Sequence, residues 1–305
     1  MELVEQVRES CAWVAAQSTQ VHIDESRLVA YAEDLRPRRT ATGRDDDRPA
    51  AGRREWLAAY WLTLNAVNFG SGWFPTLLKM PGMTGYRTIK AGIDRRFRDD
   101  GPWTAAKLRR ITIAEISTLM MQEPDHPLMA LFKVSLRDLG AHLERGYDGR
   151  FTAVVDAAGG SAVNFVETLA GWDCFADSSE YKGRTIPFLK RAQIAAADLA
   201  RAHVAAWTDL DRLTLFADNL VPHVLRLDGV LAFSPEFTTR IEAGDLIEHG
   251  APEEVEMRAC AVTAVERLNA LSGQPPWLLD QQLWNLGQQP RYKSVPRPRS
   301  RSTAY

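Results

Sequence analysis

The sequence predicts an all-α protein that folds as a single helical domain over residues 1–305. Apolar residues recur at steps of three and four, Ala and Leu are abundant, and clusters of β-branched residues are few. This spacing places apolar side chains on one face of each helix. The chain is 45% hydrophobic and 25% charged, which is typical of a soluble protein with a large core and excludes disorder over most of its length.

Two helices of the first half are indicated by specific patterns. Residues 86–97 carry Tyr, Ile, Ile and Phe at steps of three and four, which would form one buried stripe. Thr112 and Glu115 have the spacing of a capping box, in which each side chain satisfies a free backbone amide of the first turn. A helix is therefore expected over 113–121.

The second half contains further helical patterns, bounded by Gly or Pro. The residues Ser-Pro-Glu at 234–236 are typical of a helix start. The longer patterns cover residues 186–207, 252–271 and 277–286.

Residues 34–55 are rich in Arg, Asp, Pro and Gly, so a long exposed loop is expected there. The segment before this loop is too short to fold alone, and we therefore do not place a domain boundary here.

The charge balance argues against a protein that grips long nucleic acid. There are 37 Lys and Arg residues against 39 Asp and Glu, whereas such proteins bind phosphates with a basic surface. The segment 291–305 is an exception, with five basic residues and no acidic one. It is either solvated or folded back onto the protein, and flexibility is expected at 300–302.

Membrane, metal and cofactor signals are not found in the sequence. The longest apolar run, Trp56 to Leu62, is too short to span a bilayer, and the acidic start lacks a signal-peptide pattern. Three isolated cysteines, Cys11, Cys174 and Cys260, read as core residues. A cytoplasmic protein is expected, with no cofactor, no metal and no obligatory protein partner.

The segment 64–75 contains the end of an apolar helix, followed by glycines and aromatic residues. It fits an ordinary helix C-terminus, in which Gly allows a left-handed turn. It also fits a wall on which a heterocyclic base stacks, since Phe69 and Trp73 offer flat faces and Asn68 offers an amide for the base edge.

Lys190 and Arg191 lie where a helix is expected to begin. Cations at this end oppose the helix dipole, which costs a few tenths of a kcal/mol unless an anion joins them. The pair is either solvated or binds a phosphate.

Asp218 precedes Pro222, which is tolerated in a first helical turn. The carboxylate therefore either caps that helix or faces a cavity where positive charge develops, and the two roles are compatible. Farther along, Glu256 and Arg258 are two residues apart on a helix and point to different faces. At least one of them is expected to find a partner inside the protein.

Several short motifs together resemble the queuosine salvage family, whose members are queuosine 5′-phosphate N-glycosylases. The resemblance extends in order from about Trp56 to the last residue. The motifs are Asn68-Phe69-x-x-x-Trp73, Lys190-Arg191-Ala192-Gln193-Ile194, Phe216-Ala217-Asp218 with Pro222-x-Val224-Leu225, Val255-Glu256-x-Arg258-x-Cys260, Leu278-Leu279-Asp280-x-x-Leu283-Trp284, and Tyr305. The chain departs from the family pattern at Asn219 and His223.

The resemblance implies a helical domain similar to helix-hairpin-helix DNA glycosylases. It implies hydrolysis of queuosine 5′-monophosphate, a small-molecule substrate, to queuine and ribose 5-phosphate. Asp218 is the implied catalytic residue. The remaining predicted contacts with the substrate come from Asn68, Phe69, Trp73, Lys190, Arg191, Glu256, Arg258, Asp280 and Tyr305.

Two other functions stay open at this stage. The same pocket could carry a deazapurine without cleaving it, and only the carboxylate separates this carrier from an enzyme. A DNA-lesion glycosylase follows from fold analogy alone and is disfavoured by the charge balance.

Overall fold

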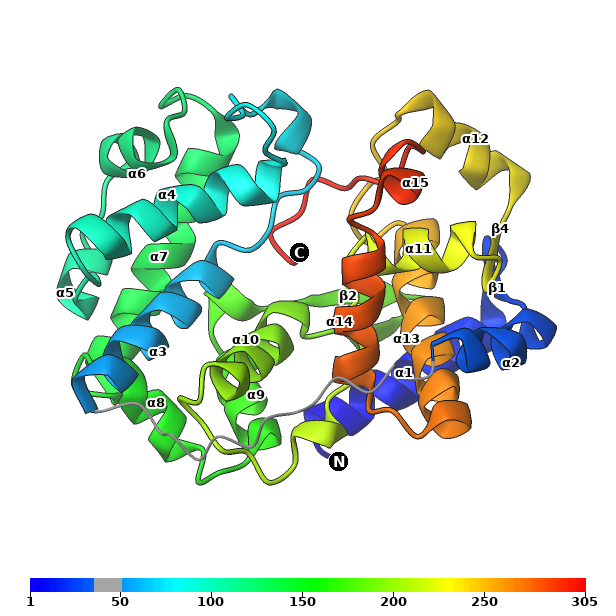
Figure 1. Cartoon of the computed structure of the whole chain (residues 1–305), viewed down its shortest axis with the longest axis horizontal. Helices are drawn as coiled ribbons and strands as arrows, with labels where there is room; N and C mark the ends of the chain where they lie inside the picture. Colours follow the sequence, from blue (N-terminus) through cyan, green and yellow to red (C-terminus); the bar gives the residue numbers. More distant parts are fainter. Residues whose placement is uncertain (36–50) are drawn as a thin grey trace. The chain divides into compact units, whose positions relative to one another are not determined.

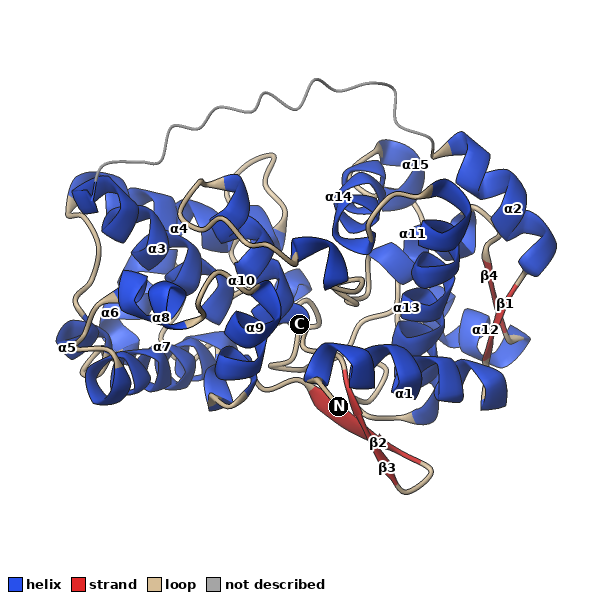
Figure 2. Ribbon diagram, turned by 90° about the horizontal axis from the view of Figure 1, so that it is seen from below, coloured by secondary structure: helices blue, strands red, loops and turns tan. Residues whose placement is uncertain are grey.

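The computed structural model describes residues 1–35 and 51–305, and it is mostly helical with two small antiparallel sheets (Figures 1 and 2). The helical prediction is confirmed in this coarse form, whereas the sheets were not expected. In the described part of the chain, no helix is both long and apolar enough to cross a lipid bilayer.

The chain divides into two compact units, and each contains segments that lie far apart in the sequence. Unit 1 contains the described part of Met1–Asp46, together with Asp177–Lys190 and Asp209–Arg301. Unit 2 contains the described part of Asp47–Ala176, together with Arg191–Thr208 and Ser302–Tyr305. The single-domain organisation over 1–305 stays a prediction.

In unit 1, shorter helices and strands pack around one long helix, α13 (Pro252–Ser272). Its elements are α1 (Leu3–Gln17), β1 (Val21–Ile23), α2 (Glu25–Asp34), β2 (Ser178–Tyr181), β3 (Arg184–Pro187), η3 (Leu210–Arg212), α11 (Val221–Leu227), β4 (Leu231–Phe233), α12 (Pro235–Ala243), α13 (Pro252–Ser272), α14 (Pro276–Leu286) and α15 (Pro290–Lys293).

Helix α13 is the central element of unit 1. It packs against α1, α2, α11, α14 and β1, and residues 254–265 are buried without interruption. A helix enclosed on all sides is normally apolar all round. Because this one carries Glu254, Glu256 and Arg258 in its buried run, each of these charges needs a partner inside the protein.

The two sheets of unit 1 are antiparallel pairs. Strand β1 pairs with β4, with Val21 opposite Phe233, and β2 pairs with β3, with Ser178 opposite Pro187. The hairpin β2–β3 occupies the start of the predicted helix 186–207. The helix itself therefore begins only at Lys190.

In its described residues, unit 2 contains helices and no strand. Its elements are α3 (Ala51–Ala66), η1 (Phe74–Thr76), α4 (Gly85–Asp99), α5 (Ala105–Leu108), α6 (Ile113–Met120), α7 (Pro127–Gly146), α8 (Phe151–Ala157), α9 (Ala162–Ala170), η2 (Asp173–Phe175) and α10 (Lys190–Arg201, of which Lys190 belongs to unit 1).

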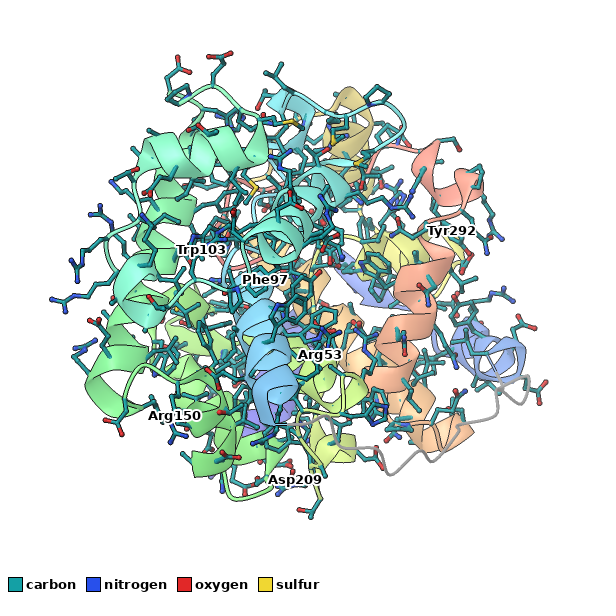
Figure 3. All side chains as sticks on the ribbon, turned by 60° about the vertical axis from the view of Figure 1, so that its left-hand side comes forward. Arg53, Phe97, Trp103, Arg150, Asp209 and Tyr292 are labelled. Atoms are coloured by element: carbon teal, nitrogen blue, oxygen red, sulfur yellow. The ribbon has the colours of Figure 1, made fainter. Side chains whose placement is uncertain are left out.

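Helix α7 is the main packing element of unit 2 and contacts α3, α5, α6 and η2. Gly140 permits the close approach of α5, because a Cβ there would lie 2.6 Å from the carbonyl oxygen of Ala105. Aromatic rings join α3 to α4. Phe97 makes edge contacts with Trp56 at 5.4 Å and with Trp103 at 6.3 Å between ring centroids. Figure 3 labels Phe97 and Trp103.

Several predicted elements agree with the structure. Thr112 and Glu115 form the expected capping box at α6, and the predicted helices 252–271 and 277–286 correspond to α13 and α14. Cys11, Cys174 and Cys260 are buried and unpaired, as expected of core residues. Burial raises the pKa of the Cys11 thiol.

Two loop predictions are affected by the structure. The last five residues of the expected loop 34–55 belong to α3, and its residues 36–50 lie outside the described part of the chain. The flexibility expected at 300–302 is wrong, since Ser300 and Ser302 are 1% and 4% exposed.

Candidate active site

Asp218 lies in the loop that leads into α11, and its side chain is half-buried. Its Oδ1 accepts hydrogen bonds from the backbone N–H of Leu220 at 2.7 Å and of Val221 at 3.1 Å. The capping role is therefore present and is worth about 1 kcal/mol. Oδ2 accepts no hydrogen bond from any described residue. This oxygen of the carboxylate is therefore available to interact with a ligand.

The backbone immediately before Asp218 is held by two buried side chains. The N–H of Phe216 donates to Oδ1 of Asp280 at 3.3 Å, and Nε of Arg258 donates to the carbonyl oxygen of Ala217 at 3.0 Å. These contacts come from two different helices, α14 and α13. The structure thus places Asp280 and Arg258 against the backbone of the two residues before Asp218. A substrate site shared by these three side chains stays a prediction.

The basic C-terminal segment contributes a cation near Asp218. Burial lowers the pKa of the Arg297 guanidinium, and the Asp218 carboxylate acts in the opposite direction. The two side chains are thus within electrostatic reach, although no ion pair within 4.0 Å joins them in the described chain. The segment is folded back onto the protein, which was one of the two expectations for it: residues up to Arg301 belong to unit 1, and Ser302–Tyr305 belong to unit 2.

Lys190 begins α10 and is 6% exposed. Its backbone N–H donates to Oδ2 of Asp177 at 2.8 Å. The same oxygen accepts from Nη2 of Arg258 at 2.7 Å, so Lys190 belongs to the same buried network as the backbone of Ala217.

Glu256 is fully buried in α13 and accepts hydrogen bonds from the chain itself. The backbone N–H groups of Thr19, Gln20 and Val21 donate to Oε2 at 2.9, 2.6 and 3.3 Å, and the Tyr181 hydroxyl donates to Oε1 at 2.8 Å. Burial and this carboxylate both raise the pKa of Tyr181. These contacts give Glu256 a structural role at β1, while its contact with substrate stays a prediction.

Both Glu256 and Arg258 have partners inside the protein, where at least one was expected to. Arg258 has no exposed side-chain surface, and its guanidinium carbon lies 3.9 Å from the ring centroid of Phe188. The substrate contact predicted for Arg258 stays a prediction, and its observed contacts are with the chain.

In unit 2, the aromatic segment after α3 is less exposed than its sequence suggests. Phe69 is 2% exposed and packs against Phe132 with ring centroids 5.1 Å apart. Trp73 and Asn68 are half-buried, and Nδ2 of Asn68 donates to Oδ1 of Asn65 at 3.2 Å. The roles of these residues in base recognition stay predictions.

Arg191 is buried in unit 2 and holds three separate backbone segments together. Its guanidinium donates to the carbonyl oxygens of Ala66 at 2.9 Å and Ala304 at 3.2 Å, and also to that of Cys174. The guanidinium carbon also lies over the Phe69 ring, 5.0 Å from its centroid. These contacts use Arg191 inside the protein, and the phosphate contact predicted for it is not observed among them.

The C-terminal residue is docked beside the same aromatic segment. Tyr305 is 2% exposed, and its backbone carbonyl oxygen accepts from the N–H of Gly70 at 3.0 Å. Gly70 has φ +95°, and a Cβ there would lie 2.4 Å from Leu128. The last residues are therefore part of unit 2, together with Asn68, Phe69 and Trp73.

Comparison with known proteins identifies the family. The family model described as queuosine salvage protein matches residues 49–305. The chain belongs to this family.

Named relatives of the queuosine salvage family cover nearly the whole chain. A queuosine 5′-phosphate N-glycosylase/hydrolase of Sphaerobacter thermophilus is 33% identical over 96% of this chain and 95% of its own length. Proteins of the same name from Mus musculus and Nematostella vectensis are 26% and 27% identical, over 98% and 86% of this chain and 98% and 81% of their own lengths. The similarity thus begins before Trp56, earlier than the motifs suggested.

Asp177 is a residue of the network that the sequence did not single out. It lies in a short Ala-Asp-Ser-Ser segment without a motif. Its partners, Lys190 and Arg258, are 13 and 81 residues away in the chain. Only the resemblance around those partners pointed to this part of the molecule.

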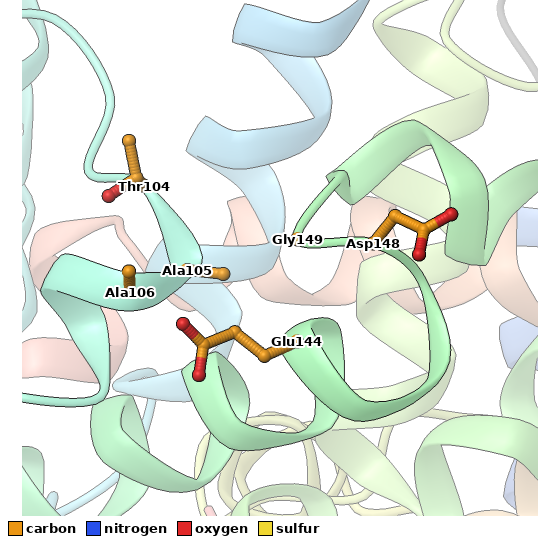
Figure 4. A pocket seen from close by; sticks show the side chains of 6 residues that line it. All are labelled: Thr104, Ala105, Ala106, Glu144, Asp148 and Gly149. Atoms are coloured by element: carbon orange, nitrogen blue, oxygen red, sulfur yellow. The ribbon is translucent and has the colours of Figure 1, made fainter.

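Unit 2 also contains an open hollow of about 560 Å³ (Figure 4). It is lined by Thr104, Ala105, Ala106, Glu144, Asp148 and Gly149. This lining offers neither an aromatic ring nor a cation for a nucleotide and contains no predicted site residue. Across residues 1–35 and 51–305, no group of three or more His, Cys, Asp or Glu side chains could hold a metal ion.

Proposed function

We propose that the protein hydrolyses the N-glycosidic bond of queuosine 5′-monophosphate and releases queuine for salvage into tRNA, together with ribose 5-phosphate. Membership of the queuosine salvage family and the names of its relatives support this function. The observation in the structure that carries it is Asp218, whose Oδ1 is fixed by two amides while Oδ2 accepts no hydrogen bond from a described residue.

The proposed reaction breaks the bond between the ribose C1′ and the base nitrogen. Positive charge develops on the sugar as this bond lengthens, and the Asp218 carboxylate would stabilise it. The oxygen of water then bonds to C1′, and one of its protons goes to the departing base. Asp218 either assists the water or traps the sugar before water attacks.

The base places a strong demand on this carboxylate. In ordinary purines, protonation of a ring nitrogen makes the base a better leaving group. A 7-deazaguanine lacks one of these nitrogens. We propose that Asp280 accepts hydrogen bonds from the amino and imino groups of the base. Glu256 is less suited to this role, because five groups of the chain already donate to it.

The remaining roles are those that the sequence predicted. Lys190 would neutralise the 5′-phosphate. Asn68, Phe69 and Trp73 would recognise the base by stacking and hydrogen bonding. Arg191 and Tyr305 would support that segment through their contacts near Phe69 and Gly70.

Two further expectations belong to this proposal. The mostly helical structure supports an arrangement similar to helix-hairpin-helix glycosylases. The three buried, unpaired cysteines support a reducing, cytoplasmic location. That no protein partner is obligatory stays a prediction.

The experiment is to incubate the purified protein with queuosine 5′-monophosphate and to separate the base from the nucleotide by chromatography. Release of queuine and ribose 5-phosphate in equal amounts is expected. Tight binding of the nucleotide without cleavage would instead indicate a carrier. Salt-sensitive binding to damaged duplex DNA, with no action on the nucleotide, would indicate a lesion glycosylase.

A further inference from the structure

Asp177 connects the start of α10 to the central helix α13. Its Oδ2 accepts hydrogen bonds from the backbone N–H of Lys190 at 2.8 Å and from Nη2 of Arg258 at 2.7 Å. The side chains of Asp177 and Arg258 have no exposed surface. A buried ion pair of this kind is costly to break, because removing one partner leaves the other charge unpaired.

Arg258 extends this connection to Asp218. Its Nε donates to the carbonyl oxygen of Ala217, the residue directly before Asp218, at 3.0 Å. The planar guanidinium can bond two acceptors at once in a fixed geometry, which an ammonium group cannot do. The ring of Phe188, 3.9 Å away, limits its movement further.

Asp177 also stabilises the strained turn that leads into Lys190. Leu189 has φ +56°, a left-handed conformation that costs a residue with a side chain about 1 kcal/mol or more. The backbone N–H groups of Phe188 and Leu189 donate to the carbonyl oxygen of Asp177 at 2.9 and 3.3 Å. The carbonyl and carboxylate oxygens of Asp177 thus accept hydrogen bonds from three successive backbone amides, those of residues 188–190.

We propose that Asp177 is a positioning residue that fixes Lys190 and Asp218 relative to each other through Arg258. This inference rests on the proposed function, in which Asp218 acts at the sugar and Lys190 at the phosphate. All the residues that take part in these contacts belong to unit 1. Asp177 acts through the backbone of these two residues and does not itself contact the substrate.

The test is the steady-state kinetics of Asp177→Asn on queuosine 5′-monophosphate and on the nucleoside queuosine. Asn keeps the size of the side chain and one acceptor oxygen but removes the charge that holds Arg258. We expect kcat to fall about tenfold to a hundredfold on both substrates, because Asp218 is displaced. We expect KM to rise about tenfold for the monophosphate alone, because Lys190 is displaced.

Asp228→Asn is the matched control for a merely structural loss. Asp228 is also buried in unit 1 and accepts from the hydroxyls of Tyr31 at 2.6 Å and Tyr292 at 2.9 Å, and from Arg291. Within residues 1–35 and 51–305, this cluster makes no hydrogen bond or ion pair with Lys190, Ala217 or Asp218. The control should lower the unfolding midpoint and leave kcat and KM of the folded protein unchanged.

Arg258→Lys is the second variant, since it keeps a positive charge near Asp177 but cannot reach both acceptors. A lowered kcat in this variant supports the proposal. Wild-type kcat and KM in folded Asp177→Asn, or wild-type kcat in Arg258→Lys, would overturn it. A wild-type protein that releases no queuine would contradict the proposed function instead, so the two failures are distinguishable.

Discussion

The side-chain amide of Asn219 donates to the carbonyl oxygen of Pro298 at 2.7 Å. Asn219 follows Asp218 directly, and Pro298 lies within the basic C-terminal segment. A second bond, from the N–H of Ile247 to the carbonyl oxygen of Arg299 at 2.8 Å, holds the same segment. The loop that carries the catalytic candidate and the C-terminal segment are therefore stabilised together.

Replacing Asn219 with Asp should release the C-terminal segment. The carboxylate has no donor for Pro298 and repels its carbonyl oxygen, so local opening should become about tenfold more frequent. Trypsin cleavage after Arg299 measures this opening. Asn164→Asp, an exposed substitution in α9, is the control. An unchanged cleavage rate in Asn219→Asp would mean that the bond to Pro298 contributes nothing to holding the segment.

Lys190→Met should affect the two forms of the substrate differently. Loss of a charge-assisted contact with the 5′-phosphate costs about 1.5 to 3 kcal/mol. We therefore expect kcat/KM to fall about ten- to a hundredfold for the monophosphate, and to change little for the nucleoside. Lys182→Met, at an exposed lysine in the β2–β3 hairpin, should change neither value. An equal loss on both substrates would show that Lys190 does not recognise the phosphate.

Glu256→Gln should destabilise the protein more than it affects catalysis. The amide nitrogen of Gln cannot accept the hydrogen bonds that Glu256 now receives from the backbone at 19–21 and from Tyr181, so we expect a loss of about 2 to 4 kcal/mol in the free energy of unfolding. Urea denaturation measures this loss, and the exposed Glu248→Gln is the control. Unchanged stability with a strongly raised KM would assign Glu256 to the substrate instead.

His223 should make stability depend on pH. Its Nε2 donates to the carbonyl oxygen of Tyr292 at 2.9 Å, and burial, aided by Arg226 and Arg297, lowers its pKa from 6.5 to about 4. Below pH 6.5 the unfolded chain binds a proton that the folded protein excludes. Stability is therefore full above pH 6.5 and falls as the pH decreases toward 4.

The contribution of His223 between pH 7 and pH 5 should be about 2 kcal/mol. Urea denaturation at both pH values measures it in the wild type and in His223→Gln, whose amide can still donate to Tyr292. The variant should lose about 2 kcal/mol less than the wild type over this interval. An identical loss in both proteins would show that His223 does not titrate in this range.

The sequence predicted those parts of the fold that depend on local patterns. Helix α13 could be recognised from the Pro and Gly residues that bound it, and α6 from the spacing of Thr112 and Glu115. The hairpin β2–β3 was missed, because its two four-residue strands show little apolar–polar alternation in the sequence and depend on packing against α1 and α13. The strained conformation of Leu189 likewise depends on Asp177, a residue distant in the sequence.

The candidate site was predictable where side-chain chemistry follows from local position. Asp218 could be recognised as a cap from its position before Pro222 and as a candidate catalyst from the family motif around it. Phe69 was expected to present an open face, but its burial is determined by Phe132 and Arg191, which no local pattern reveals. Asp177 was missed because its role consists entirely of contacts with distant residues.

Single-turnover cleavage of queuosine 5′-monophosphate by Asp218→Asn tests the central claim most directly. Asn retains a carbonyl oxygen that can accept from Leu220 and Val221, so the variant should fold with nearly normal stability and still bind the nucleotide. Queuine release should be about a thousandfold slower than in the wild type, or slower still. Cleavage at a comparable rate would contradict the account and assign the chemistry to another group.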